Sequence, residues 1–203
     1  MKEKNENIHD DQLLVSKILS GDTGAFSKII RNTEGLVAQI VFKMISNKED
    51  RRDIAQDVYL KAFQSLPGFR FQSKISTWIA QICYNSCLNY LEKRKLIFPY
   101  DFPNNNYSND EILELLWAGN SILSSETENL MYQKDLSEIL KSQLDKLPPV
   151  YKTLITLYHN EELTYDEICE ITGLPEGTVK NYLFRARKEL RDNLLITYKK
   201  EEL

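Results

Sequence analysis

A few residues in this sequence have side chains and spacing that could do acid–base chemistry. Asp53 and Asp57 are four residues apart, with Lys61 four further on, so all three would share one face of a helix. Such a carboxylate pair could move a proton or hold a metal. The only two histidines, His9 and His159, are remote from this pair in the sequence. We therefore expect a solvated or partner-binding helix face here, and no enzyme.

The cysteines offer little reactive chemistry. Cys83 and Cys87 lie four apart, which places their Cβ atoms about 5–6 Å apart on a helix. A disulfide needs about 3.5–4.5 Å, so a bridge would distort the helix. With Cys169 the total is three, and an odd number fits a reducing compartment better than a disulfide framework. We expect small core residues, and neither a bound metal nor a cofactor, because Cys-x-x-Cys and paired histidines are missing.

Base-reading chemistry is concentrated near the C-terminal end. The chain as a whole carries a net charge of −4, but residues 178–191 hold a single acid, Glu189, against five bases: Lys180, Arg185, Arg187, Lys188 and Arg191. A local basic stretch is what phosphate binding requires. Asparagine can pair bidentately with adenine, and arginine with guanine. The alternative is a solvated helix face, and charge alone does not separate the two.

The elements that would position these residues form a helix-turn-helix. Thr164 and Glu167 fit a capping box that starts a helix at residue 165, and Gly173 fits a left-handed residue that ends it. Pro175 suits the first turn of the next helix. The inner face of that helix is predicted from the apolar spacing of Val179, Leu183, Ala186 and Leu190. Two helices joined by a glycine-containing turn are typical of DNA-binding modules.

The opposite face of the second helix is then the candidate recognition face. It would present Lys180, Asn181, Phe184, Arg185 and Lys188. Thr178 and the free N–H groups of the first turn could hold a phosphate, and Gly177 would allow close approach of a DNA strand. A plain helical hairpin with a basic outer face remains the alternative on these features.

Helical spacing covers most of the remaining sequence and predicts an all-α protein. We expect a polar N-terminal tail at 1–10, a helical domain at 11–95, a linker at 96–134 and the helix-turn-helix domain at 135–203. Within 11–95, helices are expected over 13–19, 26–30, 36–45, 54–66 and 75–95. The linker carries one lysine against six acids, with one helical turn at 112–117, and should be a flexible tether.

Composition narrows the class further. The 203 residues include only seven glycines and six prolines, which disfavours a loop-rich all-β protein. The longest apolar runs fall well short of the roughly 20 residues that span a bilayer, and the first ten residues lack an apolar signal core. We expect a cytoplasmic protein without membrane insertion.

Two sets of motifs resemble the extracytoplasmic-function (ECF) sigma factors of bacterial RNA polymerase. Their C-terminal region 4 is similar to residues 147–152, 163–169, 174–181 and 184–190. Their region 2 is similar to residues 21–26, 53–63 and 76–85. The two sets stand in the family's order and are separated by a suitable linker. The resemblance therefore implies two small helical domains, a region-2 bundle and a region-4 helix-turn-helix, joined by a flexible acidic linker.

The resemblance also implies functions for particular residues. Binding of core RNA polymerase, through the coiled coil of its largest subunit and its flap region, would involve Asp53, Gln56, Asp57 and Lys61. The promoter −10 element would meet Phe69, Arg70, Phe71, Lys74, Trp78 and Asn85, with Asn85 near an extruded base. The −35 element would be read by Thr178, Lys180, Asn181, Phe184, Arg185 and Lys188. An anti-sigma factor is a further expected partner.

Some residues depart from the family pattern. Asn89 replaces a common aspartate, Arg51-Arg52 replaces a common Ala-Glu pair, and Glu176 puts a negative charge beside the expected DNA surface. These departures bear on which promoter is read. Two other classes remain open: a helix-turn-helix regulator that acts without polymerase, and a helical interaction protein without a nucleic-acid function. The N-terminal block separates them, since a simple regulator would have a sensing or receiver domain there.

Overall fold

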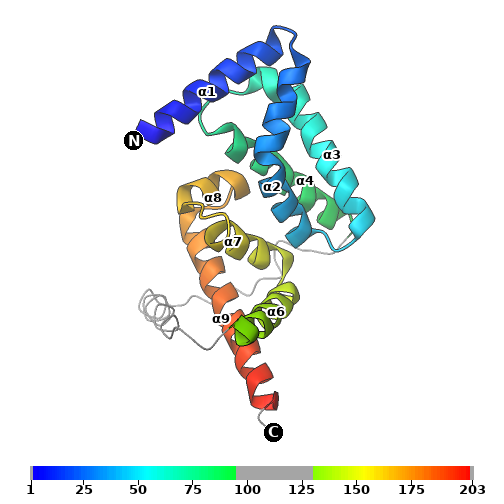
Figure 1. Cartoon of the computed structure of the whole chain (residues 1–203), viewed down its shortest axis with the longest axis vertical. Helices are drawn as coiled ribbons and strands as arrows, with labels where there is room; N and C mark the ends of the chain where they lie inside the picture. The colour runs from blue at the N-terminus through cyan, green and yellow to red at the C-terminus, as the bar shows by residue number, and fades with distance from the viewer. Residues whose placement is uncertain (1, 95–129, 202–203) are drawn as a thin grey trace.

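The computed structural model describes residues 2–94 and 130–201, which form helices and contain no strand. Figure 1 shows two groups: an N-terminal bundle (residues 2–94) and a C-terminal bundle (residues 130–201) that lie against each other. The expectation of an all-α fold is confirmed. None of the helices in these two bundles is long and apolar enough to cross a membrane.

The N-terminal bundle consists of four α-helices and two short 3-10 turns. In chain order these are α1 (Lys2–Leu19), η1 (Thr23–Ala25), α2 (Phe26–Met44), α3 (Lys48–Ser65), η2 (Leu66–Gly68) and α4 (Ile75–Lys93). Two sequence-based boundaries were wrong. The expected polar tail is helical from Lys2, and the segments expected at 26–30 and 36–45 form one helix. Gly35 inside α2 costs only about 1 kcal/mol of helix propensity, too little to break it.

The core of this bundle follows the predicted spacing. Ile54, Val58, Ala62 and Leu66 are at most 8% exposed along one side of α3 and its end. Helix α4 is more deeply enclosed, because it packs against α2 and α3 and also against the C-terminal bundle. Cys83 and Cys87 are fully buried free thiols, as expected of small core residues.

The C-terminal bundle contains α6 (Leu130–Lys146), α7 (Pro149–His159), α8 (Tyr165–Thr172) and α9 (Glu176–Glu201). Helix α6 begins before residue 135, so the end of the expected linker is helical. The helical turn expected at 112–117 and the expected tether lie outside the described residues. Pro148 and Pro149 separate α6 from α7, because proline cannot continue the preceding helix but fits a first turn.

The two bundles are in direct contact. Helix α7 packs on α2, and α8 packs on α4. Helix α7 is consequently covered on more than one side: every residue from Thr153 to Leu157 is buried, which is typical of a helix enclosed by neighbours. Sequence patterns did not predict this contact.

Candidate nucleic-acid and polymerase interfaces

The helix-turn-helix forms as its sequence predicts. The Thr164 N–H donates to Glu167 Oε2 at 3.0 Å, and the Glu167 N–H donates to Thr164 Oγ1 at 3.3 Å, which completes the capping box at the start of α8. Gly173 ends α8 at φ 70°, where its lack of a Cβ avoids backbone strain. Glycine and cap together fix the turn that sets α9 against α8.

Helix α9 buries the four residues that the spacing assigned to its inner face. Val179, Leu183 and Ala186 are fully buried, and Leu190 packs against the same core. Thr178, near the start of the helix, is half-buried. The predicted recognition face is therefore on the correct side of the helix relative to this core.

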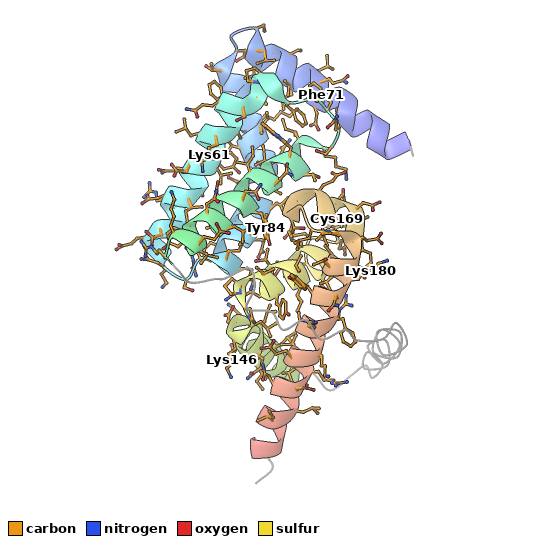
Figure 2. The ribbon with its side chains drawn as sticks, turned by 180° about the vertical axis from the view of Figure 1, so that it is seen from behind. Lys61, Phe71, Tyr84, Lys146, Cys169 and Lys180 are labelled. Atoms are coloured by element: carbon orange, nitrogen blue, oxygen red, sulfur yellow. The ribbon has the colours of Figure 1, made fainter. Side chains whose placement is uncertain are left out.

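That face is less open than predicted. Lys180 projects outward from α9 in Figure 2, whereas Asn181, Arg185 and Lys188 are half-buried, and Phe184 is only 5% exposed. The expectation that Phe184 is exposed was wrong. Helices α6, α7 and α8 all contact α9, so its buried arc is wider than one apolar stripe.

Local partners already engage the charged side chains of this face. Lys180 Nζ lies 2.6 Å from Glu176 Oε1 and 5.4 Å from the centre of the Tyr165 ring. The hydrogen bond to Glu176 raises the pKa of Lys180. Burial raises the pKa of Tyr151, an effect partly offset by a hydrogen bond from Arg185. The Oδ1 atom of Asn181 is buried and accepts no hydrogen bond from the described residues.

The loop before α4 contains a cluster of aromatic rings that pack at tilted angles. The Phe69 ring centre lies 4.7 Å from that of Phe71 and 4.9 Å from that of Trp78. Phe71 has φ 55°, a left-handed conformation that is strained for a bulky residue and occurs more often at functional sites. Asp11 of α1 anchors the end of this loop, since its Oδ2 accepts the Ile75 N–H at 3.0 Å. Sequence reasoning missed this long-range cap.

An open pocket of about 420 Å³, here called the loop pocket, lies beside these rings. It is lined by Gly68, Phe69, Arg70, Gln72, Ser73, Thr77, Trp78, Gln81 and Glu170. Aromatic faces, a cation and amides are the groups that bind an unstacked base and its phosphate. Three of the residues predicted to bind the −10 element, Phe69, Arg70 and Trp78, thus meet in one pocket, whereas Asn85 is exposed further along α4, outside its lining.

The residues predicted to bind polymerase lie on the solvent side of α3. Asp53, Gln56, Asp57 and Lys61 are all exposed, as expected of a partner-binding face. Lys61 Nζ donates to Ser86 Oγ of α4 at 3.0 Å. Asp57 and Lys61 line a groove of about 220 Å³ between α3 and α4.

Two apolar side chains on this side of α3 were not among the predicted site residues. Leu60 is 56% exposed and Phe63 is 39% exposed, although Phe63 touches the Phe26 ring edge-on at 5.1 Å. Both follow Gln56 on one helical face. Leu60 lies outside the apolar spacing of α3, and that position was the signal available in the sequence. Phe63 was counted in that apolar spacing, and its 39% exposure corrects the expectation. We call Asp53, Gln56, Leu60 and Phe63 the docking face.

The comparisons with known proteins decide between the classes left open by the sequence. Residues 29–97 match the Sigma-70 region 2 family, and residues 137–190 match Sigma-70, region 4. An ECF RNA polymerase sigma-E factor from Haemophilus influenzae is 32% identical over 189 residues, which cover 91% of this chain and 95% of that protein. This chain belongs to the ECF sigma factors. It is a transcription initiation factor and not an enzyme.

Other relatives of this sigma factor agree. The ECF sigma factor SigW of Bacillus subtilis is 29% identical, with 89% of this chain and 94% of SigW covered. The sigma-E factor of Escherichia coli is 31% identical, with 89% and 92% covered. Among solved structures, CnrH in complex with the cytosolic domain of CnrY has a TM-score of 0.59 at 20% identity, covering 91% of this chain and 96% of CnrH. RpoE of Bartonella quintana, in complex with the anti-sigma factor NepR, has a TM-score of 0.58 at 20% identity, covering 84% and 97%. These structures share the fold.

Proposed function

We propose that this sigma factor has three binding surfaces, one each for core polymerase, the −10 element and the −35 element. The docking face of α3, with Asp57 and Lys61, binds core RNA polymerase. The loop pocket, Lys74 at the start of α4 and Asn85 further along the same helix bind the −10 strand. The N-terminal half of α9 reads the −35 element through Thr178, Lys180, Asn181, Arg185 and Lys188, whereas Phe184 is buried and supports the helix from inside. The protein works in the cytoplasm, where polymerase and chromosome are found.

The loop pocket carries this proposal. A base leaving the duplex loses a few kcal/mol of stacking and pairing, and a stack on an aromatic ring returns about 1–3 kcal/mol. Phe69 and Trp78 line the pocket with such rings, Phe71 packs against Phe69, and the exposed Arg70 in the same lining can meet a phosphate. The loop pocket thus has the chemistry to bind one strand of melted promoter DNA.

An anti-sigma protein is a further proposed partner. The solved structures of CnrH and of RpoE hold those sigma factors with CnrY and with the anti-sigma factor NepR, respectively. The shared fold gives this chain the same two bundles for such a protein to hold. Co-purification of the chain with a protein that blocks its binding to core polymerase would support this partner.

The function is tested by promoter opening with purified core polymerase. We expect Arg70→Ala to slow opening, read as fluorescence of 2-aminopurine placed in the −10 element, without changing affinity for core polymerase. Arg70 is exposed, so its loss should change the free energy of unfolding by no more than about 0.5 kcal/mol. Lys28→Ala, an exposed change on α2, is the matched control. Normal opening by the Arg70→Ala protein would contradict the assignment of the loop pocket.

A further inference from the structure

The end of α7 and the start of α8 place two tyrosines beside the recognition helix. The ring centre of Tyr158 lies 5.1 Å from that of Tyr165, and the Arg187 guanidinium of α9 lies 5.1 Å from the centre of the Tyr158 ring. Lys180 Nζ lies 5.4 Å from the centre of the Tyr165 ring. We call Tyr158, Tyr165, Lys180 and Arg187 the tyrosine edge. Of the four, Lys180 alone was among the residues predicted to bind the −35 element.

His159, the last residue of α7, holds the Arg187 end of this edge. The Arg187 Nε–H donates to His159 Nε2 at 3.3 Å. An imidazole nitrogen accepts a hydrogen bond only while it carries no proton, so this contact requires a neutral ring with its proton on Nδ1. Protonation of His159 would remove the acceptor and place a second cation beside Arg187. The position of the guanidinium therefore depends on the charge of one histidine.

The surroundings of His159 favour its neutral form. Partial burial lowers its pKa, and the positive charge of Arg187 lowers it further. Its ring meets the uncharged Tyr158 edge-on at 5.0 Å, and Tyr158 is hydrogen-bonded to Tyr165 of α8, which is also uncharged. The charged groups of the following loop, of α8 and of α2 do not cause this shift, among them Glu161, Glu162, Asp166 and Lys43. Arg187 is thus the charged group that decides the state of this histidine in the free chain.

The tyrosine edge lies where a DNA backbone passes a helix-turn-helix. In this motif the second helix enters the major groove, and the first helix crosses the phosphate backbone. The first helix here is α8, which begins at Tyr165, and Arg187 follows Lys180 about two turns later on one face of α9. Guanidinium, ammonium and tyrosine hydroxyl groups are donors that bind phosphate oxygens. The edge therefore has the position and the chemistry to contact the backbone beside the −35 bases.

We propose that His159 is a positioning residue for −35 binding, which holds Arg187 in the free chain and releases it to a DNA phosphate. When the guanidinium turns from the imidazole to a phosphate, Nε2 loses its hydrogen-bond donor and lies near an anion. It then takes up one proton from solvent, so that binding of the −35 duplex is coupled to protonation of His159. This proposal rests on the assignment of α9 to the −35 element.

Proton uptake makes the affinity for DNA rise as the pH falls. In the free chain, burial and Arg187 hold the pKa of His159 below its ordinary value. In the complex, a phosphate in place of Arg187 raises that pKa. The gain in affinity is therefore complete below the pKa of the free chain and is lost as the pH rises through the pKa of the complex. Each unit by which DNA raises the pKa contributes up to about 10-fold in affinity.

The pH profile of His159→Gln tests the coupling. The amide oxygen of glutamine can still accept the Arg187 N–H, but the side chain takes up no proton. Binding of a labelled −35 duplex by holoenzyme is measured from about pH 8 to about pH 5.5, the range in which histidine titrates. Toward acid pH we expect the wild type to gain at least about 3-fold more affinity than His159→Gln. The other histidine of the chain supplies the control, since His9→Gln should follow the wild type. Parallel profiles of the wild type and His159→Gln, or a wild type that weakens in acid relative to this variant, would overturn the proposal.

The titration of His159 itself separates this proposal from the −35 assignment. The chain has two histidines, so the loss of one imidazole proton signal in His159→Gln assigns the NMR spectrum of the full-length protein. We expect the pKa of His159 to lie below its ordinary value in the free chain and to rise when the −35 duplex is added at low salt. A protein that prefers the −35 duplex to a scrambled duplex without a change in this pKa would overturn the positioning by His159 alone. If neither the wild type nor His159→Gln prefers the −35 duplex, the assignment of α9 fails, and the proposal fails with it.

Discussion

At the scale of single residues, the recognition face of α9 is held in local interactions that DNA would have to replace. The buried Oδ1 of Asn181 accepts no hydrogen bond within the described residues, and a buried unsatisfied acceptor costs about 1–3 kcal/mol. Arg185 is hydrogen-bonded to Tyr151, and Lys180 is paired with Glu176. An adenine that donates to Asn181 Oδ1 would remove that cost once the side chain turns toward DNA. Binding of the base therefore favours the breaking of the local interactions that hold this face of α9.

Arg185→Ala tests base reading. A guanidinium can contact two acceptors of a guanine, and its loss should cost about 1–3 kcal/mol and relax the preference at one −35 position. The measurement is the abortive-initiation rate on promoters changed base by base across the −35 element. An unchanged base preference would remove Arg185 from base reading, whatever the total activity of the variant.

The Lys180–Glu176 pair predicts opposite salt dependences for its two members. Glu176→Gln leaves Lys180 without its anionic partner, so promoter binding should strengthen and depend more steeply on salt. Lys180→Ala removes a phosphate contact and should lower the salt slope by about one ion on all sequences alike. Binding to a −35 duplex by holoenzyme at several salt concentrations measures both. Equal slopes in both variants would show that Lys180 does not contact phosphate.

At the scale of elements, turns and caps were the best-predicted features because each has a local cause. Thr164, Glu167 and Gly173 lie within ten residues. The hydrogen bonds between Thr164 and Glu167 and the missing Cβ of Gly173 fix the two ends of α8 without contacts from residues far away in the sequence. The end of the loop before α4 was missed for the opposite reason: its cap is Asp11, 64 positions away. Phe184 was misplaced because one helix was expected to have one buried stripe, and α9 has three neighbours.

Two glycines of the helix-turn-helix should separate stability from DNA binding. At Gly173, with φ 70° and open space around an added Cβ, alanine should lower the free energy of unfolding by about 1 kcal/mol through backbone strain alone. At Gly177, a helical position with equal room, alanine should raise it by up to about 1 kcal/mol. If DNA passes close to Gly177, that same protein should lose −35 binding several-fold. Thermal melts and −35 duplex binding measure the two effects, and a gain in stability with unchanged binding would exclude the close approach.

The docking face of α3 predicts an apolar anchor for polymerase. Leu60→Ala should weaken binding of core polymerase by roughly 10-fold, because an exposed leucine buried by a partner contributes about 1.5–3 kcal/mol. Stability should hardly change, since Leu60 is already in solvent. Leu13→Ala, 51% exposed on α1, is the matched control. Equal affinities of the two proteins for core polymerase would place the contact elsewhere.

At the scale of the whole molecule, the sequence predicted the two bundles but not how they meet. Each bundle has an apolar periodicity that indicates its own core. The buried apolar residues of the two bundles nevertheless form one continuous cluster, and no period in either bundle shows which residues of the other it will contact. Thr153 and Thr156 of α7 are buried, yet their hydroxyls donate to carbonyls of their own helix. Because these donors are satisfied within α7, the two hydroxyls need no hydrogen-bond partner from the N-terminal bundle.

The interface also contains like charges that oppose closure. Burial lowers the pKa of Lys152 on α7; Asp145 counteracts this, while Lys43 and Arg51 of the N-terminal bundle lower the pKa further. Lys43 Nζ and Asp145 Oδ1 lie 3.9 Å apart, so the Asp145 carboxylate interacts with both Lys43 and Lys152. The ion pairs of Lys74 with Glu167 and of Lys43 with Asp145 therefore favour the closed arrangement, whereas the repulsion of Lys152 from Lys43 and Arg51 opposes it.

This balance predicts that two substitutions at one interface act in opposite directions. Lys152→Met removes a partly buried charge and its repulsion from Lys43 and Arg51, so the bundles should close more firmly, whereas Glu167→Gln should let them separate. The radius of gyration of the free chain, from small-angle X-ray scattering across salt concentrations, should stay small in the first protein and rise in the second.

Added salt should compact the wild type less than it compacts Glu167→Gln. In the wild type, salt screens both the Lys74–Glu167 attraction and the repulsion around Lys152, so the two effects offset each other. In Glu167→Gln that attraction is already gone, so salt mainly screens the repulsion. Lys146→Met, a change on exposed α6, should behave as wild type. If Lys152→Met and Glu167→Gln both expand the chain, the interface depends on packing at these positions and not on the sign of their charge.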